Sequence, residues 1–203
     1  MRSIVAAFAL AAAPLVAMAQ PFTMKLSTVT INDVTHEWMK AFKAGVEARA
    51  GNRMKVEIYP ASQLGPLPRV IEGVAMGTVE LTVPTPGFMV GIEPRYLVLD
   101  VPGLFDDLQH GHQVLGDAEL RKRFASFGAA RGVEPLFLYL NGPAMLLSHK
   151  PVRSVADLKG QKIRVPGGAP LHVEPFKKLG VAPLSVALGE VLPAMQNRSI
   201  DGL

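Results

Sequence analysis

The stretch SVADLKGQKIRVPGG, at residues 154–168, contains a capped turn, a glycine stop, a strand and the start of a second helix. Ser154 and Asp157 resemble a capping box at the first turn, although Glu or Gln is the usual last member of that motif. Gly160 is suited to end the turn because glycine adopts a positive φ without steric cost. This order of elements predicts an α/β fold.

The segment QKIRV at 161–165 alternates polar and apolar side chains, as a strand with one buried face does. Pro166 ends the strand, and Gly167 leaves bare backbone ahead of Pro170, a favourable first residue of a helix. Arg164 is therefore predicted to lie where open α/β sheets bind ligands and where free N–H groups favour anions. Its guanidinium is suited to a carboxylate; the alternative is a surface arginine in a loose ion pair, which contributes little.

Alternating strands and helices precede this stretch and predict a mostly parallel sheet. The loops after the first and third strands should share one edge of that sheet, so Thr28 and Thr85 are expected there. The predicted strands are 22–27, 54–59, 79–83, 97–101 and 134–141, and the predicted helices are about 34–50, 70–76 and 107–127. After the stretch we expect a helix at about 170–179, an extended segment at 183–187 and a helix at 190–197.

The sequence Asn141-Gly142-Pro143 interrupts an apolar run and predicts a crossing between two α/β units. We expect an N-terminal unit at 20–142 and a second unit at 143–203 that carries Arg164.

Residues 1–19 are predicted to be a secretory signal peptide. Arg2 supplies a positive start, residues 4–13 are apolar, and Ala17-Met18-Ala19 is an A-x-A cleavage site. The apolar run is too short to span a bilayer. We therefore expect cleavage after Ala19 and export; a retained N-terminal anchor is the alternative.

The composition is that of a folded protein without disulfides. Hydrophobic residues make up 49% of the chain and no cysteine is present. The formal net charge is +4, and the basic residues are scattered apart from the run at 121–123. Scattered charge on an exported chain argues against nucleic-acid binding. No segment after residue 19 is long and apolar enough to predict a membrane span.

The sequence offers little support for an enzyme or a metal site. His110 and His112 are two residues apart on a predicted helix, where such side chains face away from each other. His36, His149 and His172 are isolated and are interpreted as structural or exposed. No G-x-S-x-G, H-E-x-x-H or phosphate-binding glycine-rich motif is present. We therefore predict no catalytic residue, no cofactor and no metal.

Six motifs in order resemble the extracytoplasmic solute receptors of TRAP transporters, which are periplasmic solute-binding proteins of the DctP type. Each motif is modest by itself, but their order behind a signal peptide is specific. They are YPASQLG at 59–65, LDVPGLF at 99–105, ADLKGQKIRVP at 156–166, LGVAP at 179–183, EVLPAMQ at 190–196 and IDG at 200–202.

The resemblance implies a two-lobed periplasmic-binding-protein fold that closes on a small organic acid. The family's hallmark arginine, which pairs with the ligand carboxylate, corresponds to Arg164. Loops that contact the ligand correspond by position to Thr28, Thr85 and Gly167. Ala144 stands where many members have a second arginine, so whether a second arginine contacts the ligand is not predicted. Some sialic-acid-binding members have an acidic residue at the position of Thr85, which disfavours that substrate.

The function implied is capture of a carboxylate in the periplasm and its delivery to the membrane subunits of a TRAP transporter. Family members continue beyond the IDG motif, so we expect an incomplete second lobe in this chain, as a fragment of a longer reading frame or a truncated product. The alternatives are a secreted enzyme, a binding protein of another uptake system, and a non-functional truncated remnant. The identity of the ligand and the oligomeric state are not predicted.

Overall fold

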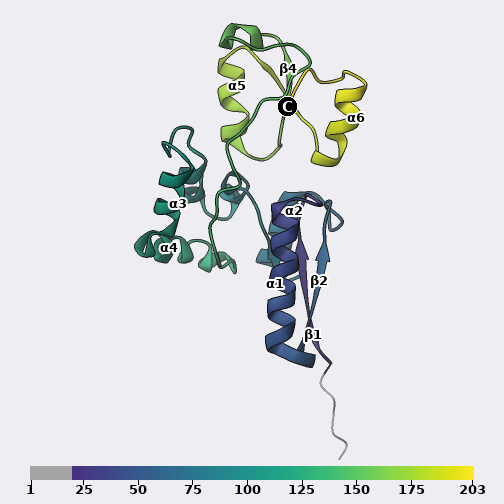
Figure 1. Ribbon diagram of the computed structural model, residues 1–203, viewed down its shortest axis with the longest axis vertical. Coiled ribbons are helices and arrows are strands. Elements are labelled where there is room, and N and C mark those ends of the chain that lie inside the picture. Colours follow the sequence, from purple (N-terminus) through teal and green to yellow (C-terminus); the bar gives the residue numbers. More distant parts are fainter. Residues whose placement is uncertain (1–19) are drawn as a thin grey trace, which may run out of the picture.

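The computed structural model describes residues 20–203, so the predicted signal peptide at 1–19 lies outside the described residues. Two parallel sheets organise two lobes (Figure 1). The first lobe contains the elements β1 to α4, and the second contains the elements after residue 148, with the end of the chain beside β4. The predicted α/β class with parallel sheets is confirmed.

The sheet of the first lobe has three parallel strands in the order β2-β1-β3. They are β1 (Phe22–Ser27), β2 (Met54–Tyr59) and β3 (Leu81–Thr82). The first two strands match their predicted bounds because one apolar face repeats every second residue. The third is shorter than predicted and pairs with β1 only at two positions.

Helices α1 (Val34–Ala50) and α2 (Leu67–Ala75) accompany this sheet. The carboxylate of Asp33 accepts a hydrogen bond from the backbone N–H of His36 at 2.9 Å, which caps α1. Met39 on α1 is fully buried with Leu26 and Val56 of the sheet, and these side chains form the core of the lobe. A short 3-10 turn, η1 (Gly51–Arg53), leads from α1 into β2.

The prediction of a strand at 97–101 is wrong, because that run lies in the 3-10 helix η3 (Pro94–Asp100). Pro94 is a favourable first helical residue, and the carboxylate of Glu93 accepts from the N–H of Arg95 at 3.0 Å. Tyr96 is buried and its hydroxyl donates to the Phe127 carbonyl at 3.0 Å. Capping and aromatic burial thus outweigh the apolar strand-like pattern. A second 3-10 helix, η2 (Pro86–Gly91), precedes η3.

The predicted helix at 107–127 is divided into α3 (Leu108–Gly116) and α4 (Ala118–Ala125). Asp117 has an extended ψ of 131°, which stops α3. Its carboxylate then accepts from the N–H of Leu120 at 2.8 Å and caps α4. The turn η4 (Ala129–Arg131) follows.

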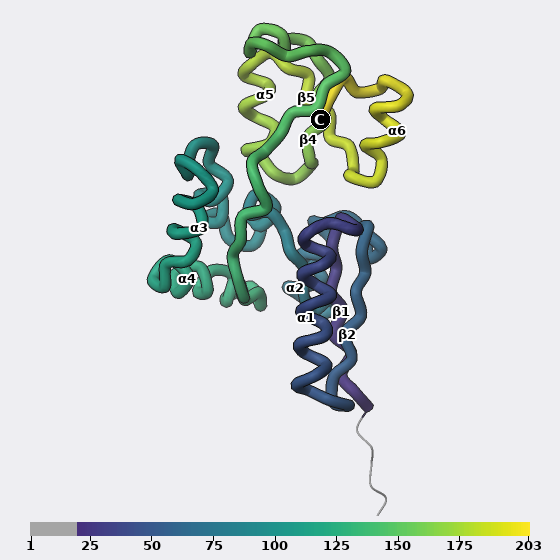
Figure 2. Tube along the Cα trace, in the orientation of Figure 1, coloured from purple at the N-terminus to yellow at the C-terminus, as the bar shows by residue number. Residues whose placement is uncertain are grey.

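Residues 134–141 form no strand, which contradicts the prediction. No strand of the described chain pairs with this segment; side chains fix it instead. The ring of Phe137 lies 4.2 Å from that of Trp38, and the hydroxyl of Tyr139 is 2.8 Å from that of Thr35 on α1. Figure 2 shows this segment leaving the region of α3 and α4 and rising to the second lobe.

The sheet of the second lobe is built on two parallel strands, β4 (Lys162–Val165) and β5 (Ala182–Ser185). Gly202 forms bridges with Ile163 of β4 on one side and with Ser148 on the other. The carboxylate of Asp157 accepts from the N–H of Ser154 at 2.8 Å, as a capping box requires, and Gly160 has the positive φ that was predicted, 76°. The helical elements of this lobe are η5 (Val155–Leu158), η6 (Pro170–His172), α5 (Glu174–Lys178), η7 (Leu188–Glu190) and α6 (Val191–Gln196).

Candidate ligand-binding site

Arg164 lies one residue before the carboxyl end of β4, at the position that the sequence predicted. Its neighbours Ile163 and Val165 point into the core and are 1% and 2% exposed, so Arg164 is directed to the opposite face and is half-buried. Its Nε–H donates to the Val186 carbonyl at 3.0 Å. Burial lowers the pKa of Arg164, but an arginine remains cationic at neutral pH.

The two terminal nitrogens of Arg164 have no hydrogen bond or ion pair with any residue from 20 to 203. The bond to Val186 holds the stem and leaves the outer edge of the guanidinium available. A half-buried cation without an internal counterion attracts an anion from solution, and a carboxylate matches its geometry.

Gly167 follows the strand end and lies against the end of β5. A Cβ atom at Gly167 would collide with the hydroxyl of Ser185. The register pairs Val165 with Ser185, which explains why the two segments meet there. Sequence reasoning missed Ser185 and Val186; the available signal was that neighbouring parallel strands end at the same sheet edge.

Thr85 is exposed and directly precedes η2, and this loop contacts the loop that carries Gly167. A Cβ at Gly87 would lie 3.1 Å from the Cβ of Ala169 in the second lobe. A Cβ at Gly168 would lie 3.7 Å from the ring of Phe88. The loops that follow β3 and β4 therefore meet between the lobes, with Thr85 and Gly167 on either side of the contact.

Thr28 is buried directly after β1. Its hydroxyl lies 3.1 Å from that of Thr30, and its carbonyl accepts from the N–H of Ser62 at 3.1 Å. These hydrogen bonds lie within the first lobe, so they order the loop beside the sheet edge. Ala144 lies in the exposed segment between the lobes and presents no cation there.

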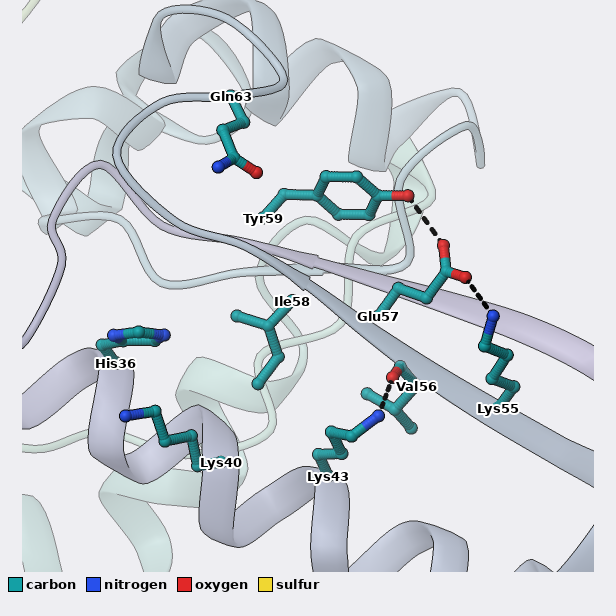
Figure 3. A pocket seen from close by; sticks show the side chains of 9 residues that line it. All are labelled: His36, Lys40, Lys43, Lys55, Val56, Glu57, Ile58, Tyr59 and Gln63. Carbon is teal, nitrogen blue, oxygen red and sulfur yellow. Dashed lines mark hydrogen bonds and ion pairs between the residues drawn. The ribbon is translucent and has the colours of Figure 1, made fainter.

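A separate cavity of about 620 Å³ lies on the first lobe, between α1 and β2 (Figure 3). Each of its lysines is already paired with a carboxylate. Lys55 lies 2.6 Å from the carboxylate of Glu57, which also accepts from the hydroxyl of Tyr59 at 2.7 Å, and Lys40 and Lys43 pair with Glu37 and Glu47 outside the cavity lining. Lys43 binds the Val56 carbonyl. Arg164 is not among the residues that line this cavity. The internal pairing makes it a poorer anion site than Arg164.

His110 pairs with Asp106 at 3.2 Å, and residues 20–203 contain no group of three or more side chains that could hold a metal ion. Over the same residues, no helix has both the length and the apolar character needed to cross a bilayer.

Residues 27–203 match the model of the family described as bacterial extracellular solute-binding protein, family 7. A solute-binding protein of Roseobacter denitrificans is 33% identical over 92% of this chain and 57% of its own length. The 2,3-diketo-L-gulonate-binding periplasmic protein YiaO of Escherichia coli is 31% identical over 83% of this chain and 51% of its own length. The chain thus spans about half the length of these curated relatives.

A crystal structure of a TRAP periplasmic solute binding protein from Xanthobacter autotrophicus, with bound β-D-galacturonate, superposes with a TM-score of 0.82. It is 26% identical, and the match covers 88% of this chain and 60% of that one. The fold and the resemblance inferred from six motifs are therefore confirmed. The chain belongs to the bacterial extracellular solute-binding proteins of family 7, to which its parallel sheets, its strand-end arginine and its motif order had pointed.

Proposed function

We propose that this protein is a periplasmic receptor that captures a small organic acid and delivers it to a TRAP-type membrane permease. The single observation that supports this most strongly is the guanidinium of Arg164, half-buried at the end of β4, with its terminal nitrogens unpaired among residues 20–203. We also propose that the signal peptide directs export of the chain and is cleaved after Ala19.

The ligand class follows from chemistry that two relatives share. The Xanthobacter protein holds β-D-galacturonate, and the Escherichia coli protein is named for 2,3-diketo-L-gulonate. Both molecules are sugar-derived acids with one carboxylate and several hydroxyl groups. Arg164 is suited to the carboxylate, while Thr85, Thr28 and the backbone at Gly167 are proposed to bind the polar remainder.

Binding is proposed to proceed by closure of one lobe on the other. The two units are taken as residues 20–142 and 143–203, so Thr28 and Thr85 belong to the first and Arg164 to the second. A ligand that contacts both units stabilises the closed arrangement, because it binds that arrangement better than the open one. The segment around Ala144 connects the units and is expected to bend when they close.

Calorimetric titration with D-galacturonate, D-glucuronate and L-malate tests the role of Arg164. Removing one partner of a buried charged pair costs about 2–5 kcal/mol, so Arg164→Ala should weaken binding about 30- to several-thousand-fold. Arg164→Lys keeps the charge but loses the planar fork, and it should recover only part of the affinity. Equal affinity of Arg164→Ala and the parent protein would refute the proposal.

The family consists of solute-binding receptors, and we propose in addition that this chain does not transform its ligand. An acid that is bound and then released by denaturation should be recovered chemically unchanged, as read by NMR. Steady loss of the acid with catalytic amounts of protein would favour an enzyme instead.

A further inference from the structure

A histidine and an aspartate approach each other across the two lobes. Asp100 ends η3 in the first lobe, and its side chain is 12% exposed. His172 lies in η6 of the second lobe, and its Nε2 is 3.8 Å from the Asp100 carboxylate. This distance is too long for a hydrogen bond, so the attraction is that of an ion pair when the imidazole is protonated.

Asp100 is held rigidly for this contact. Its carboxylate accepts a hydrogen bond from the backbone N–H of Gly87 at 2.6 Å. A Cβ at Gly87 would collide with that carboxylate, so the absence of a side chain permits the approach. The acid is therefore fixed to the loop that follows Thr85 and is directed toward the second lobe.

One nitrogen of His172 is enclosed at the contact, although 32% of the side chain is exposed. Its Nδ1 is buried and has no hydrogen-bond partner among residues 20–203. The preceding residues pack on the first lobe, since Ala169 is 1% exposed and faces Gly87, and Gly168 faces Pro68 and Phe88. The polar pair is thus the charged part of a close contact between the two lobes.

We propose that Asp100 and His172 are positioning residues that hold the two lobes together beside the ligand site. The inference rests on the proposed receptor function and deepens it. His172 lies on the loop that begins at Gly167, directly after the strand of Arg164, so anchoring that loop to Asp100 sets the distance between Arg164 and Thr85. The pair biases the protein toward the closed arrangement and increases affinity without touching the ligand.

A distance measurement tests the proposal without any ligand. The sequence contains no cysteine, so Ala44→Cys on α1 and Lys178→Cys on α5 supply two exposed sites for spin labels, one in each lobe. Pulsed electron resonance then reports the distribution of distances between the lobes. Asp100→Asn and His172→Gln should each give longer and broader distributions.

Two further variants separate charge from other effects. His110→Gln removes the His110–Asp106 pair, which lies within the first lobe, and it should leave the distribution unchanged. His172→Lys retains a cation opposite Asp100 and should restore much of the short distance. Distributions of Asp100→Asn and His172→Gln that match the parent would overturn the proposal, as would a His172→Lys variant as open as His172→Gln.

Affinity for D-galacturonate provides the second readout. Loss of an ion pair of this length and exposure should weaken binding by up to about 5-fold through the shifted open–closed equilibrium. If Arg164→Ala abolishes binding while Asp100→Asn and His172→Gln bind like the parent, the receptor function stands and the role of the Asp100–His172 pair is refuted. If no acid binds the parent protein but the distances still change in Asp100→Asn and His172→Gln, the role of the pair stands and the proposed ligand class fails.

Discussion

Replacement of Gly202 by alanine should destabilise the second lobe selectively. Gly202 lies between two extended segments, and a Cβ there would be 2.5 Å from the Leu147 carbonyl oxygen and 3.1 Å from Cδ1 of Ile163. The first neighbour is backbone, which cannot rotate away as a side-chain end does. The chain must therefore separate from residue 147, from β4, or from both.

The cost follows from the contacts that such a separation breaks. Leu147 and Leu203 exchange two backbone hydrogen bonds of 2.9 Å, and Arg164 donates its N–H to the Gly202 carbonyl at 2.7 Å. Overpacking costs about 1–3 kcal/mol and each lost hydrogen bond about 1 kcal/mol. Partial relaxation reduces the sum, so we expect Gly202→Ala to lower the free energy of unfolding by about 2–4 kcal/mol.

Urea unfolding followed by two signals measures this effect. Trp38 is the single tryptophan and lies in the first lobe, so its fluorescence reports that lobe. Far-ultraviolet circular dichroism reports both lobes. Gly202→Ala should lower the midpoint of the dichroism transition by more than about 1 M urea, with a smaller change in the fluorescence transition.

Gly189→Ala is the matched control, because a Cβ at Gly189 meets no atom within 4 Å and its φ is not positive. This variant should unfold like the parent protein. If Gly202→Ala and Gly189→Ala have the same midpoint, the steric reasoning about the second sheet is wrong.

Two further predictions concern the first lobe. Hydrogen bonds from the side chain and the backbone N–H of Arg95 lower the pKa of Glu93 to about 2. A carboxyl whose pKa is lowered in the folded state stabilises the fold when the pH is above the ordinary carboxyl pKa, and this contribution is lost as the pH falls toward 2. The melting temperature of Glu93→Gln should therefore be lower than that of the parent at about pH 6 and equal to it at the lowest pH. A difference that persists unchanged in acid would contradict this. The hydroxyls of Thr35 and Tyr139, 2.8 Å apart, tie the crossing segment to α1; a double-mutant cycle of Thr35→Val and Tyr139→Phe should give a coupling of about 1 kcal/mol in urea unfolding, and a coupling near zero would show that the rings alone hold the segment.

Alternation between a buried and an open face was sufficient to predict the bounds of three strands, whereas the alternating run at 79–83 forms a strand only at Leu81–Thr82. β1, β2 and β4 follow that pattern, and the pattern also placed Arg164 opposite Ile163 and Val165. These strands can be predicted because alternation of apolar and polar side chains with a period of two residues indicates a half-buried strand. Mainly apolar runs without a strict alternation have several explanations, and both of the wrong strands, 97–101 and 134–141, were runs of that kind.

Partners distant in sequence explain what the patterns missed. Asp100 is far from His172 in sequence, and only the contact between the lobes brings the two side chains together. Ser185 and Val186 likewise acquire their place beside Arg164 and Gly167 from the register of β4 and β5. Sequence motifs identify a family, but they do not predict which distant backbone segment a side chain will contact.

Packing of the IDG motif at 200–202 on β4 helps to build the proposed ligand site. The carboxylate of Asp201 accepts from the backbone N–H of Lys162 at 2.8 Å, and the backbone N–H of Asp201 donates to the Lys162 carbonyl at 2.7 Å. Gly202 then passes close to Ile163 and accepts from the N–H of Arg164. The backbone of the arginine is thus fixed from one side by the IDG motif, and its side chain is fixed from the other by Val186. If the guanidinium binds the ligand as proposed, its position depends on the packing of Gly202, and Gly202→Ala should reduce affinity as well as stability.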